Sequence, residues 1–480
     1  MSAIIIRKRH MAMKERLKKI NEFEWMLPKG SAEKMRVAAK IIGNKAIIDS
    51  VEDAAVQQLT NVACLPGVIE PIVGLPDMHW GYGLPMGAVS AFDEEEGVIS
   101  SGLCGFDINC GVNSIRTNLT AKEIKPKIKE LISVLFRNIP CGVGAKGKLK
   151  LDIGELDDVL KRGVDWSLEK GYGVKKDKEN MEEYGCMAGG DPSKVSDLAK
   201  KRGREQLGTL GAGNHFLEIQ SVDRIFDEAF GKRLGISGKD QVMIMLHCGS
   251  RGLGHQVATD YLQIQEQAVK KYNIWLPDPQ LACAPATSKE GQDYFAAMKC
   301  AVNYAFTNRL VMTQWVRESF EKVFGRDWES MDMQTVYGIA HNVVKYEEHK
   351  IGGEKKMVYV HRKGATRAFP DIPVLIAGTM GTASYIMKGT HKAMDLTFGS
   401  SCHGAGRCMS RNEAIKRFGG GKVKENLLSR GIESIATHPT VLAEEAPEAY
   451  KDVESVIDSV QGAGISLRVA RLVPLAVAKG

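Results

Sequence analysis

Seven short loops constrain this sequence more than any other feature, because most of them combine glycine with a histidine, cysteine or aspartate. They occupy residues 74–89, 101–112, 207–218, 246–255, 339–342, 377–385 and 400–407. Glycine allows positive φ and a close approach of the backbone to a ligand, as phosphate-binding and metal-binding loops both require. An ordinary turn explains one such loop but not seven, so we expect a fold that gathers them around a site.

The segments between the loops predict a mixed architecture. Apolar periodicity indicates a long helix over about 293–324, and capping-box spacings predict helix starts at Thr120 and Ser50. Because helices and strands do not alternate in a βαβ rhythm, we predict an α+β fold. No linker bounds residues 255–335, which allow a mostly helical insertion. Strands are predicted at 242–246, 357–360, 374–376 and 465–477.

Composition excludes some classes of protein and leaves others open. Hydrophobic residues make up 44% of the chain and charged residues 26%, which is typical of a folded globular protein. The net charge of +7 permits a phosphate-rich partner without requiring one. Ten cysteines without a C-x-x-C pair indicate a reducing compartment. The short apolar run near the N-terminus fits neither a secretion signal nor a membrane span, so we expect a cytoplasmic protein with no membrane contact.

Five residues in the loops have the side chains of a metal site. Asp107 and Cys110 are three positions apart, and His215, His247 and His341 each lie in or beside a loop. Each alone is more often a buried cysteine, a turn aspartate or a hydrogen-bonded core histidine than a ligand. Together they form a mixed nitrogen, oxygen and sulfur set that suits Mn²⁺, Zn²⁺ or Co²⁺ and argues against Mg²⁺.

His403 differs from the other histidines because Gly404, Ala405, Gly406 and then Arg407 follow it. Backbone amides of such a loop can bind phosphate, so His403 is either a nucleophile towards phosphorus or a histidine beside an anion site. Residues 142–149 imitate a P-loop, but a leucine replaces its Ser/Thr and a helix precedes it, so we reject that motif. The K-x-D-G motif of ordinary nucleic-acid ligases is absent.

Taken together, the loops resemble those of the RtcB family of GTP-dependent RNA-splicing ligases. The matching segments are PDMHWGYGLPMG, FDINCGV, LGTLGAGNHFLE, HCGSRGLG, GTMGTASY, CHGAGR and a terminal Ala-Lys-Gly, in the family's order from about residue 20 to 480. The resemblance implies a single large domain over residues 1–480. Mixed and antiparallel sheets would surround a central metal cleft, with helices packed outside.

The resemblance also implies an activity, namely joining an RNA 3′-phosphate or 2′,3′-cyclic phosphate to a 5′-hydroxyl in tRNA splicing or RNA repair. Cys110 would bridge two Mn²⁺ ions per chain, Asp107 and His215 completing one site and His247 and His341 the other. His403 would form a guanylyl-histidine with GTP. The RNA substrates would be tRNA halves or broken RNA ends, and an archease-type activator is a candidate partner.

Further binding residues follow by similarity. The family's usual proline at the first position of the 377–380 loop is alanine here, which puts the detailed contacts of that loop in doubt. The implied contacts to GTP are Asn214, His215, Phe216, Leu217, Glu218, His341, Asn342, Ala377, Gly378, Thr379, Met380, Ser384, His403, Gly404, Ala405, Gly406 and Lys479. The implied contacts to RNA phosphates are Lys201, Arg202, Arg251, Arg407 and Arg411.

Two other functions compete with this interpretation. A metal-dependent phosphoesterase would share the metal site without needing the CHGAGR loop or Lys479. A non-enzymatic RNA-binding module is disfavoured, since the charge is modest, aromatic residues are only 7% of the chain, and the sequence displays no stacking platform.

Overall fold

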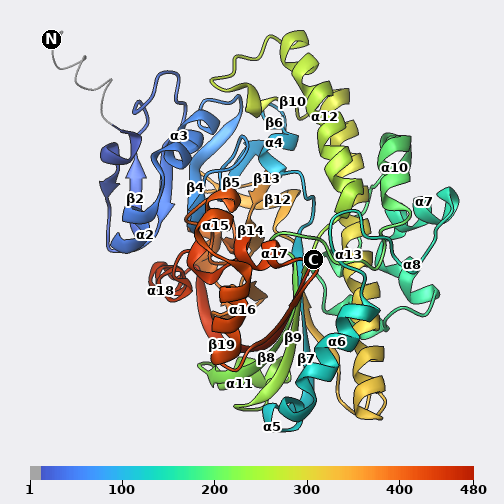
Figure 1. Cartoon of the computed structure of the whole chain (residues 1–480). Coiled ribbons are helices and arrows are strands. Elements are labelled where there is room, and N and C mark those ends of the chain that lie inside the picture. The colour runs from blue at the N-terminus through green and yellow to red at the C-terminus, as the bar shows by residue number, and fades with distance from the viewer. Residues whose placement is uncertain (1–11) are drawn as a thin grey trace.

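An eight-stranded sheet forms the centre of the molecule (Figure 1). The computed structural model describes residues 12–480; the apolar run near the N-terminus, which is expected to be neither a secretion signal nor a membrane span, lies outside them. Neighbouring strands of this sheet are antiparallel, except for β18 (Glu433–Ala436), which runs parallel to β19. In order across the sheet the other strands are β11 (Gln334–Gly338), β7 (Gly111–Thr120), β9 (Gln241–Cys248), β8 (Phe216–Ile225), β19 (Ser466–Lys479), β16 (Ser384–Gly389) and β15 (Pro373–Ile376).

A second, seven-stranded sheet is formed mainly by the N-terminal part of the chain and one later hairpin. Only its β3–β4 pair is parallel. Its strands, in order, are β1 (Lys18–Lys19), β2 (Glu24–Leu27), β3 (Ala39–Ile42), β4 (Val68–His79), β5 (Met86–Asp93), β13 (Glu354–Lys363) and β12 (Asn342–Ile351). Two short pairs complete the β-structure: β6 (Val98–Ile99) with β10 (Ala284–Pro285), and β14 (Ala365–Arg367) with β17 (Ser400–Cys402).

Helices lie around the outside of the sheets (Figure 1). This arrangement of mixed sheets and surrounding helices confirms the predicted α+β single-domain fold. In chain order the helices are α2 (Lys45–Ser50), α3 (Asp53–Val62), α4 (Ser101–Cys104), α5 (Ala121–Ile124), α6 (Ile128–Asn138), α7 (Ile153–Arg162), α8 (Val164–Glu169), α9 (Lys175–Glu179), α10 (Asp197–Gly203), α11 (Glu228–Arg233), α12 (Arg251–Lys271), α13 (Lys289–Phe324), α14 (His391–Thr397), α15 (Arg411–Arg417), α16 (Gly420–Ser429), α17 (Pro439–Glu444) and α18 (Val453–Ala463). Among residues 12–480, none of them is long and apolar enough to cross a membrane.

The longest helix, α13, runs beside the central sheet (Figure 1). It begins four residues before the predicted start, because the Ser288 side chain accepts a hydrogen bond from the Gly291 amide and caps the helix. It ends where predicted, since Gly325 adopts φ 66° and closes the last turn. Both faces of its middle turns are buried, so the polar side chains there bond to neighbouring loops rather than to water.

The two predicted capping boxes have different outcomes. Thr120 accepts from the Glu123 amide and Glu123 bonds back to Thr120, which confirms that helix start. The prediction at Ser50 is wrong, because Ser50 is the last residue of α2 and the next helix begins at Asp53. Its hydroxyl donates to the Ile47 carbonyl, a bond within the helix that ends there.

Strand pairing brings distant loops to one edge of the central sheet. Cys110 precedes β7 and His215 precedes β8, while His247 lies near the end of β9, between these two strands. The register pairs His247 with Val112 on one side and with Phe216 on the other. Because antiparallel neighbours alternate in direction, the beginnings of β7 and β8 meet the end of β9.

Candidate metal centre and nucleotide cleft

The Cys110 thiol lies at the centre of the predicted ligand set. Its Sγ is 3.2 Å from Nε2 of His215 and 3.2 Å from Nε2 of His247. On one side, Asp107 Oδ2 is 2.8 Å from His215 Nε2. On the other, His341 Nε2 is 3.2 Å from His247 Nε2. Cys110 therefore belongs to two groups of three possible ligands, Asp107–Cys110–His215 and Cys110–His247–His341, each with ligand atoms within 4.8 Å of one another.

The chemistry of these atoms fits metal ions. The Asn214 carbonyl is 3.1 Å from His247 Nδ1, which must therefore carry the hydrogen and leave the Nε2 lone pair free. Burial and the neighbouring histidines hold the pKa values of His247 and His341 well below the usual range, so both rings are neutral. Burial raises the pKa of the Cys110 thiol to about 12, and a bound cation would favour its thiolate. Lone pairs of nitrogen, oxygen and sulfur thus converge where a cation stabilises them.

A buried arginine in the middle of α13 holds the loops that carry these ligands. The Arg309 side chain is fully buried. Its Nη1 donates to the carbonyls of Asn109 and Cys248, each at 2.8 Å, and its Nη2 donates to the Ile339 carbonyl at 3.2 Å. These carbonyls belong to the residue before Cys110, the residue after His247 and the second residue before His341.

Two more contacts complete this arrangement. Arg309 Nε donates to Asn113 Oδ1 at 3.1 Å, and Nη2 donates to Asn109 Oδ1 at 3.1 Å. The preceding residue, Asn308, donates to the carbonyls of Thr209 and Gly249 and accepts from the Gly208 amide. Although burial lowers the pKa of Arg309 to about 10, it remains a cation at neutral pH. One turn of α13 thus fixes the backbone of every ligand-bearing segment.

His403 lies next to the metal ligands, with its ring centroid 4.7 Å from that of His341. Asp77, in the first glycine-rich loop, is fully buried, and its Oδ2 accepts from His403 Nδ1 at 2.6 Å and from the His403 amide at 3.1 Å. Since the carboxylate holds the hydrogen on Nδ1, the lone pair of His403 is on Nε2. Asp77 Oδ1 is buried without a hydrogen-bond partner among the described residues.

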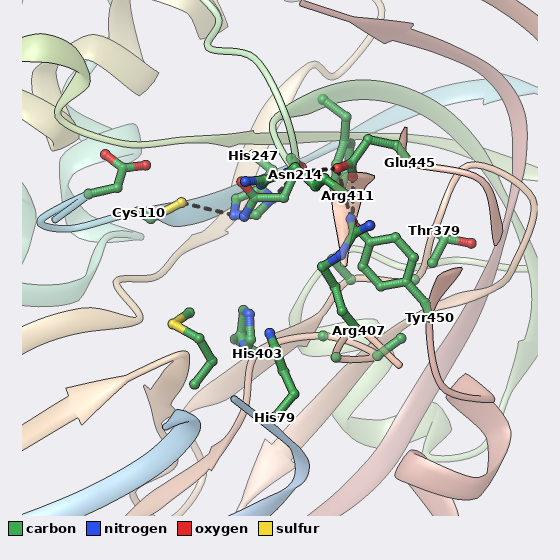
Figure 2. A pocket seen from close by; sticks show the side chains of 18 of the residues that line it. His79, Cys110, Asn214, His247, Thr379, His403, Arg407, Arg411, Glu445 and Tyr450 are labelled. Carbon is green, nitrogen blue, oxygen red and sulfur yellow. Dashed lines mark hydrogen bonds and ion pairs between the residues drawn. The ribbon is translucent and has the colours of Figure 1, made fainter. Parts of the chain in front are cut away.

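A cavity of about 580 Å³ joins this histidine to the metal ligands (Figure 2). The structure therefore brings most of the predicted nucleotide residues to one cleft, with the metal ligands at one end. His215 and His341 are buried, as are Leu217 and Ser384, and none of the four lines the cavity. The predicted residues that line it are Asp107, Cys110, Asn214, Phe216, Glu218, His247, Asn342, Ala377, Gly378, Thr379, Met380, His403, Gly404, Ala405, Gly406, Arg407, Arg411 and Lys479.

Glu445 organises the cationic side of the cleft (Figure 2). Its carboxylate is 3.2 Å from Lys479 Nζ, 3.0 Å from Arg407 Nη1 and 3.6 Å from Arg411 Nε. It also accepts from the Tyr450 hydroxyl. Burial favours a neutral acid, but Lys479, Tyr450 and the arginines outweigh it and lower the pKa of Glu445. Lys479, at the end of β19 opposite Phe216, also donates to the Gly213 carbonyl at 2.8 Å.

The structure separates the predicted RNA-phosphate cluster into two groups. Arg407 and Arg411 line the cleft, whereas Lys201 and Arg202 are exposed on α10 and do not line it. Arg251 does not line it either: its Nε donates to Thr209 Oγ1 at 3.0 Å and its Nη2 to the Gly142 carbonyl at 2.9 Å.

Sequence reasoning missed three residues of this site. Asp77 lies within the first glycine-rich loop, so a carboxylate in that loop was a signal present in the sequence. Arg309 lies inside a helix and Glu445 next to a helix end, where neighbouring residues give no sign of either contact. Both become visible only when distant segments pack together.

An α+β fold with two groups of possible metal ligands that share one cysteine, beside a cleft lined by a histidine and a glycine loop, defines a protein with a candidate metal centre. Residues 58–480 match the family model described as tRNA-splicing ligase RtcB. Proteins named tRNA-splicing ligase RtcB from Methanococcus maripaludis and Archaeoglobus fulgidus are each 51% identical, over 98% of this chain and 100% of theirs. One from Thermococcus kodakarensis is 51% identical over 97% of this chain and 99% of its own. The chain belongs to the RtcB family.

We expect Cys110→Ala to abolish binding of both ions, because each group of ligands would lose its shared member. Cys110→Ser should bind little more metal than Cys110→Ala, since an alkoxide forms far less readily than a thiolate. Elemental analysis of protein reconstituted with Mn²⁺ would measure this. Two ions retained by either variant would contradict a bridging role for Cys110.

Replacing Arg309 with lysine should weaken Mn²⁺ binding by about tenfold or more, because several buried carbonyls lose their donors. Arg317 is the matched control: it is equally buried, two turns further along α13, and pairs with Asp177 at 2.7 Å. Arg317→Lys should lower the melting temperature without changing metal affinity. The cobalt-thiolate absorption band of Co²⁺-substituted protein should shift in the Arg309 variant alone; an equal metal affinity in both variants would make Arg309 an ordinary core residue.

Proposed function

We propose that this protein is a GTP- and Mn²⁺-dependent RNA ligase that acts in tRNA splicing or RNA repair. It joins an RNA 3′-phosphate or 2′,3′-cyclic phosphate end to a 5′-hydroxyl end. The observation that carries the proposal is the Asp77–His403 pair, which leaves a histidine Nε2 lone pair beside the metal-capable groups. A metal-dependent phosphoesterase can hydrolyse its substrate with metal-activated water and does not need this histidine, whereas a ligase needs a nucleophile that carries the activating nucleotide.

His403 begins the reaction as the nucleophile. Its Nε2 attacks the α-phosphorus of GTP, the bond from that phosphorus to the bridging oxygen breaks, and pyrophosphate leaves. Asp77 accepts the Nδ1 hydrogen at 2.6 Å and stabilises the positive charge that develops on the ring. The product is a guanylyl-histidine in which GMP is joined to the protein through nitrogen.

The two later steps transfer and then release this guanylate. An oxygen of the RNA 3′-phosphate attacks the guanylate phosphorus, His403 leaves, and the RNA end carries a phosphoanhydride to GMP. The 5′-hydroxyl oxygen of the second strand then attacks the RNA phosphorus, loses its proton, and displaces GMP. A 2′,3′-cyclic phosphate must first be opened by water to the 3′-phosphate. GMP is a good leaving group, which a bare phosphomonoester lacks.

Asp107, Cys110 and His215 would hold one Mn²⁺ ion, and Cys110, His247 and His341 the other. Bound there, the metal pair would offset the negative charge of phosphate groups that approach one another. Gly404, Ala405 and Gly406, which follow His403, line the cleft. That proximity supports binding of GTP phosphates beside the metal ligands.

The remaining walls of the cleft fit a guanosine. Glu218 is buried at the cavity wall, where its carboxyl can accept hydrogen bonds from N1 and the 2-amino group of guanine. Lys479 is buried nearby and bound to Glu445, so its ammonium is held in a fixed position. Residues 377–380 and Tyr450 line the same space, and Ser384 supports that loop by accepting from the Gly378 amide at 3.0 Å.

For the RNA, phosphate contacts by Lys201, Arg202, Arg251, Arg407 and Arg411 remain part of the proposal. Arg411 has the best position, because its side chain is half exposed at the cleft while Arg407 is held by Glu445. An archease-type activator remains a candidate partner of the enzyme.

Incubation with α-labelled GTP and Mn²⁺ tests the nucleophile directly. Label should stay on denatured wild-type protein and be lost with His403→Ala, whose metal content should stay near that of the wild type. Asp77→Asn should slow labelling by about 100-fold or more, because the amide favours the wrong tautomer of His403. Normal labelling of the His403 variant would place the nucleophile elsewhere.

Glu218 should set the preference for guanine over a base without the 2-amino group. Binding of GTP and ITP would be compared by calorimetry. The wild type should prefer GTP by about 10-fold. Glu218→Gln should lose that preference, because the NH₂ group of the glutamine would face the 2-amino group of guanine and two donors cannot bond to each other.

The same carboxyl predicts a pH dependence. Burial raises the pKa of Glu218 to about 8, against the Gln220 hydrogen bond and the Lys479 charge. The protonated form therefore prevails below pH 8, and GTP binding should strengthen as pH rises towards 8, where the proton is lost. Glu218→Gln should remove this dependence. An unchanged pH profile in the variant would contradict the base contact.

A further inference from the structure

An exposed tryptophan lines the same cleft as several of the candidate metal ligands. Trp80 follows β4 and lines the cavity, yet its side chain is 58% exposed. It is the one tryptophan that lines this cavity within the part of the chain that the structure describes. Aromatic side chains commonly line ligand cavities, and an exposed ring there is free to contact a bound molecule.

The loop that carries Trp80 is held rigidly by the surrounding elements. The Trp80 amide donates to Glu52 Oε2 at 3.2 Å. The Gly81 amide donates to Gln58 Oε1 at 3.2 Å, and Gln58 Nε2 donates back to the Gly81 carbonyl. The Gly83 amide donates to Gln280 Oε1 at 2.9 Å. Because the backbone is fixed from both sides, the ring can bind a flat partner at a small cost in backbone conformational entropy.

Other aromatic rings continue from this loop towards the metal ligands. Tyr82 meets Phe106 edge to face at 5.3 Å, and Phe106 stacks on His255 at 5.2 Å. Phe106 directly precedes Asp107, a member of one metal-capable group. Tyr82 and Phe106 pack against each other, whereas no ring contact involves Trp80 among residues 12–480.

The carboxylate next to the Trp80 amide favours a base over a phosphate there, while Lys363 of the cavity wall is bonded to the Tyr82 carbonyl. Glu52, whose carboxylate binds the Trp80 amide, also lines the cavity. A carboxylate repels a phosphate group but leaves stacking of an uncharged base unaffected. Glu218 and Lys479, which also line the cleft, belong to the part that the proposed function assigns to GTP.

We propose that Trp80 is a stacking platform for a nucleobase of the RNA strand whose end enters the metal centre. The proposal rests on the proposed function for the identity of the ligand as RNA. Every nucleobase has a π face, so such a platform anchors an end without selecting its sequence. It would provide the stacking surface that the low aromatic content of the sequence did not reveal.

Binding of short single-stranded RNA tests the platform. The probes are labelled oligonucleotides that end in a 3′-phosphate or begin with a 5′-hydroxyl, measured by fluorescence anisotropy with Mn²⁺. Trp80→Ala should weaken binding of one or both by about tenfold, and Trp80→Phe should retain most of the affinity. Trp275, 47% exposed and outside the cavity, provides the control: Trp275→Ala should bind as the wild type does.

Abasic probes distinguish the two strands. Each carries one abasic ribose, at the last nucleotide of the 3′-phosphate strand or at the first nucleotide of the 5′-hydroxyl strand. Removing the base that stacks on Trp80 should weaken binding to the wild type about tenfold. The same removal should barely affect binding to Trp80→Ala, because losses of affinity from the two partners of one contact are not additive. Wild-type affinity of Trp80→Ala, or additive losses with both abasic probes, would overturn the platform.

A joining assay separates this proposal from the proposed function. If the wild type joins RNA with GTP while binding is indifferent to Trp80, the platform is wrong and the ligase assignment holds. If the wild type does not join RNA but Trp80 and one base are coupled in binding, the platform is supported and the ligase assignment is wrong.

Discussion

The guanidinium of Arg309 is the contact on which the functional site depends. Three loops that are far apart in the sequence carry Cys110, His247 and His341, and each presents a backbone carbonyl to this one side chain. Buried carbonyls need donors, and a planar group with five N–H bonds can serve several at once. The ligand atoms can therefore lie close together before any metal arrives, because α13 and the strands of the central sheet hold their backbones.

The cleft is lined by two different sets of side chains. At one end, three imidazoles, a thiol and a carboxylate face one another. At the other, Glu445 forms ion pairs with Lys479, Arg407 and Arg411. His403 lies between the two sets. Its hydrogen bond to Asp77 holds the hydrogen on Nδ1 and leaves the lone pair on Nε2. In the proposed function, this single side chain would lie between the nucleotide and the metal pair.

Several elements were predictable from local sequence. The end of α13 at Gly325, the capping box at Thr120 and the four predicted strands all follow from nearby residues, and the structure has them. Ser50 shows the limit of this reasoning, because a capping-box spacing is also compatible with a helix that ends at that serine. The partners of the predicted site residues were less accessible: Asp77 and His403 are 326 positions apart, and Glu445 bonds to residues from two other segments.

The sequence by itself determined the chemical inventory of this protein: which loops contain glycine, which side chains can bind a metal or attack phosphorus, and which family they resemble. Tertiary structure alone decided which of those side chains meet. It placed Cys110 between two groups of ligands, left Arg251 bonded to Thr209 and Gly142 outside the cleft wall, and exposed Trp80 at the rim. The physical reason is that hydrogen bonds and packing between distant segments fix these positions, and such contacts leave no periodic pattern in the chain.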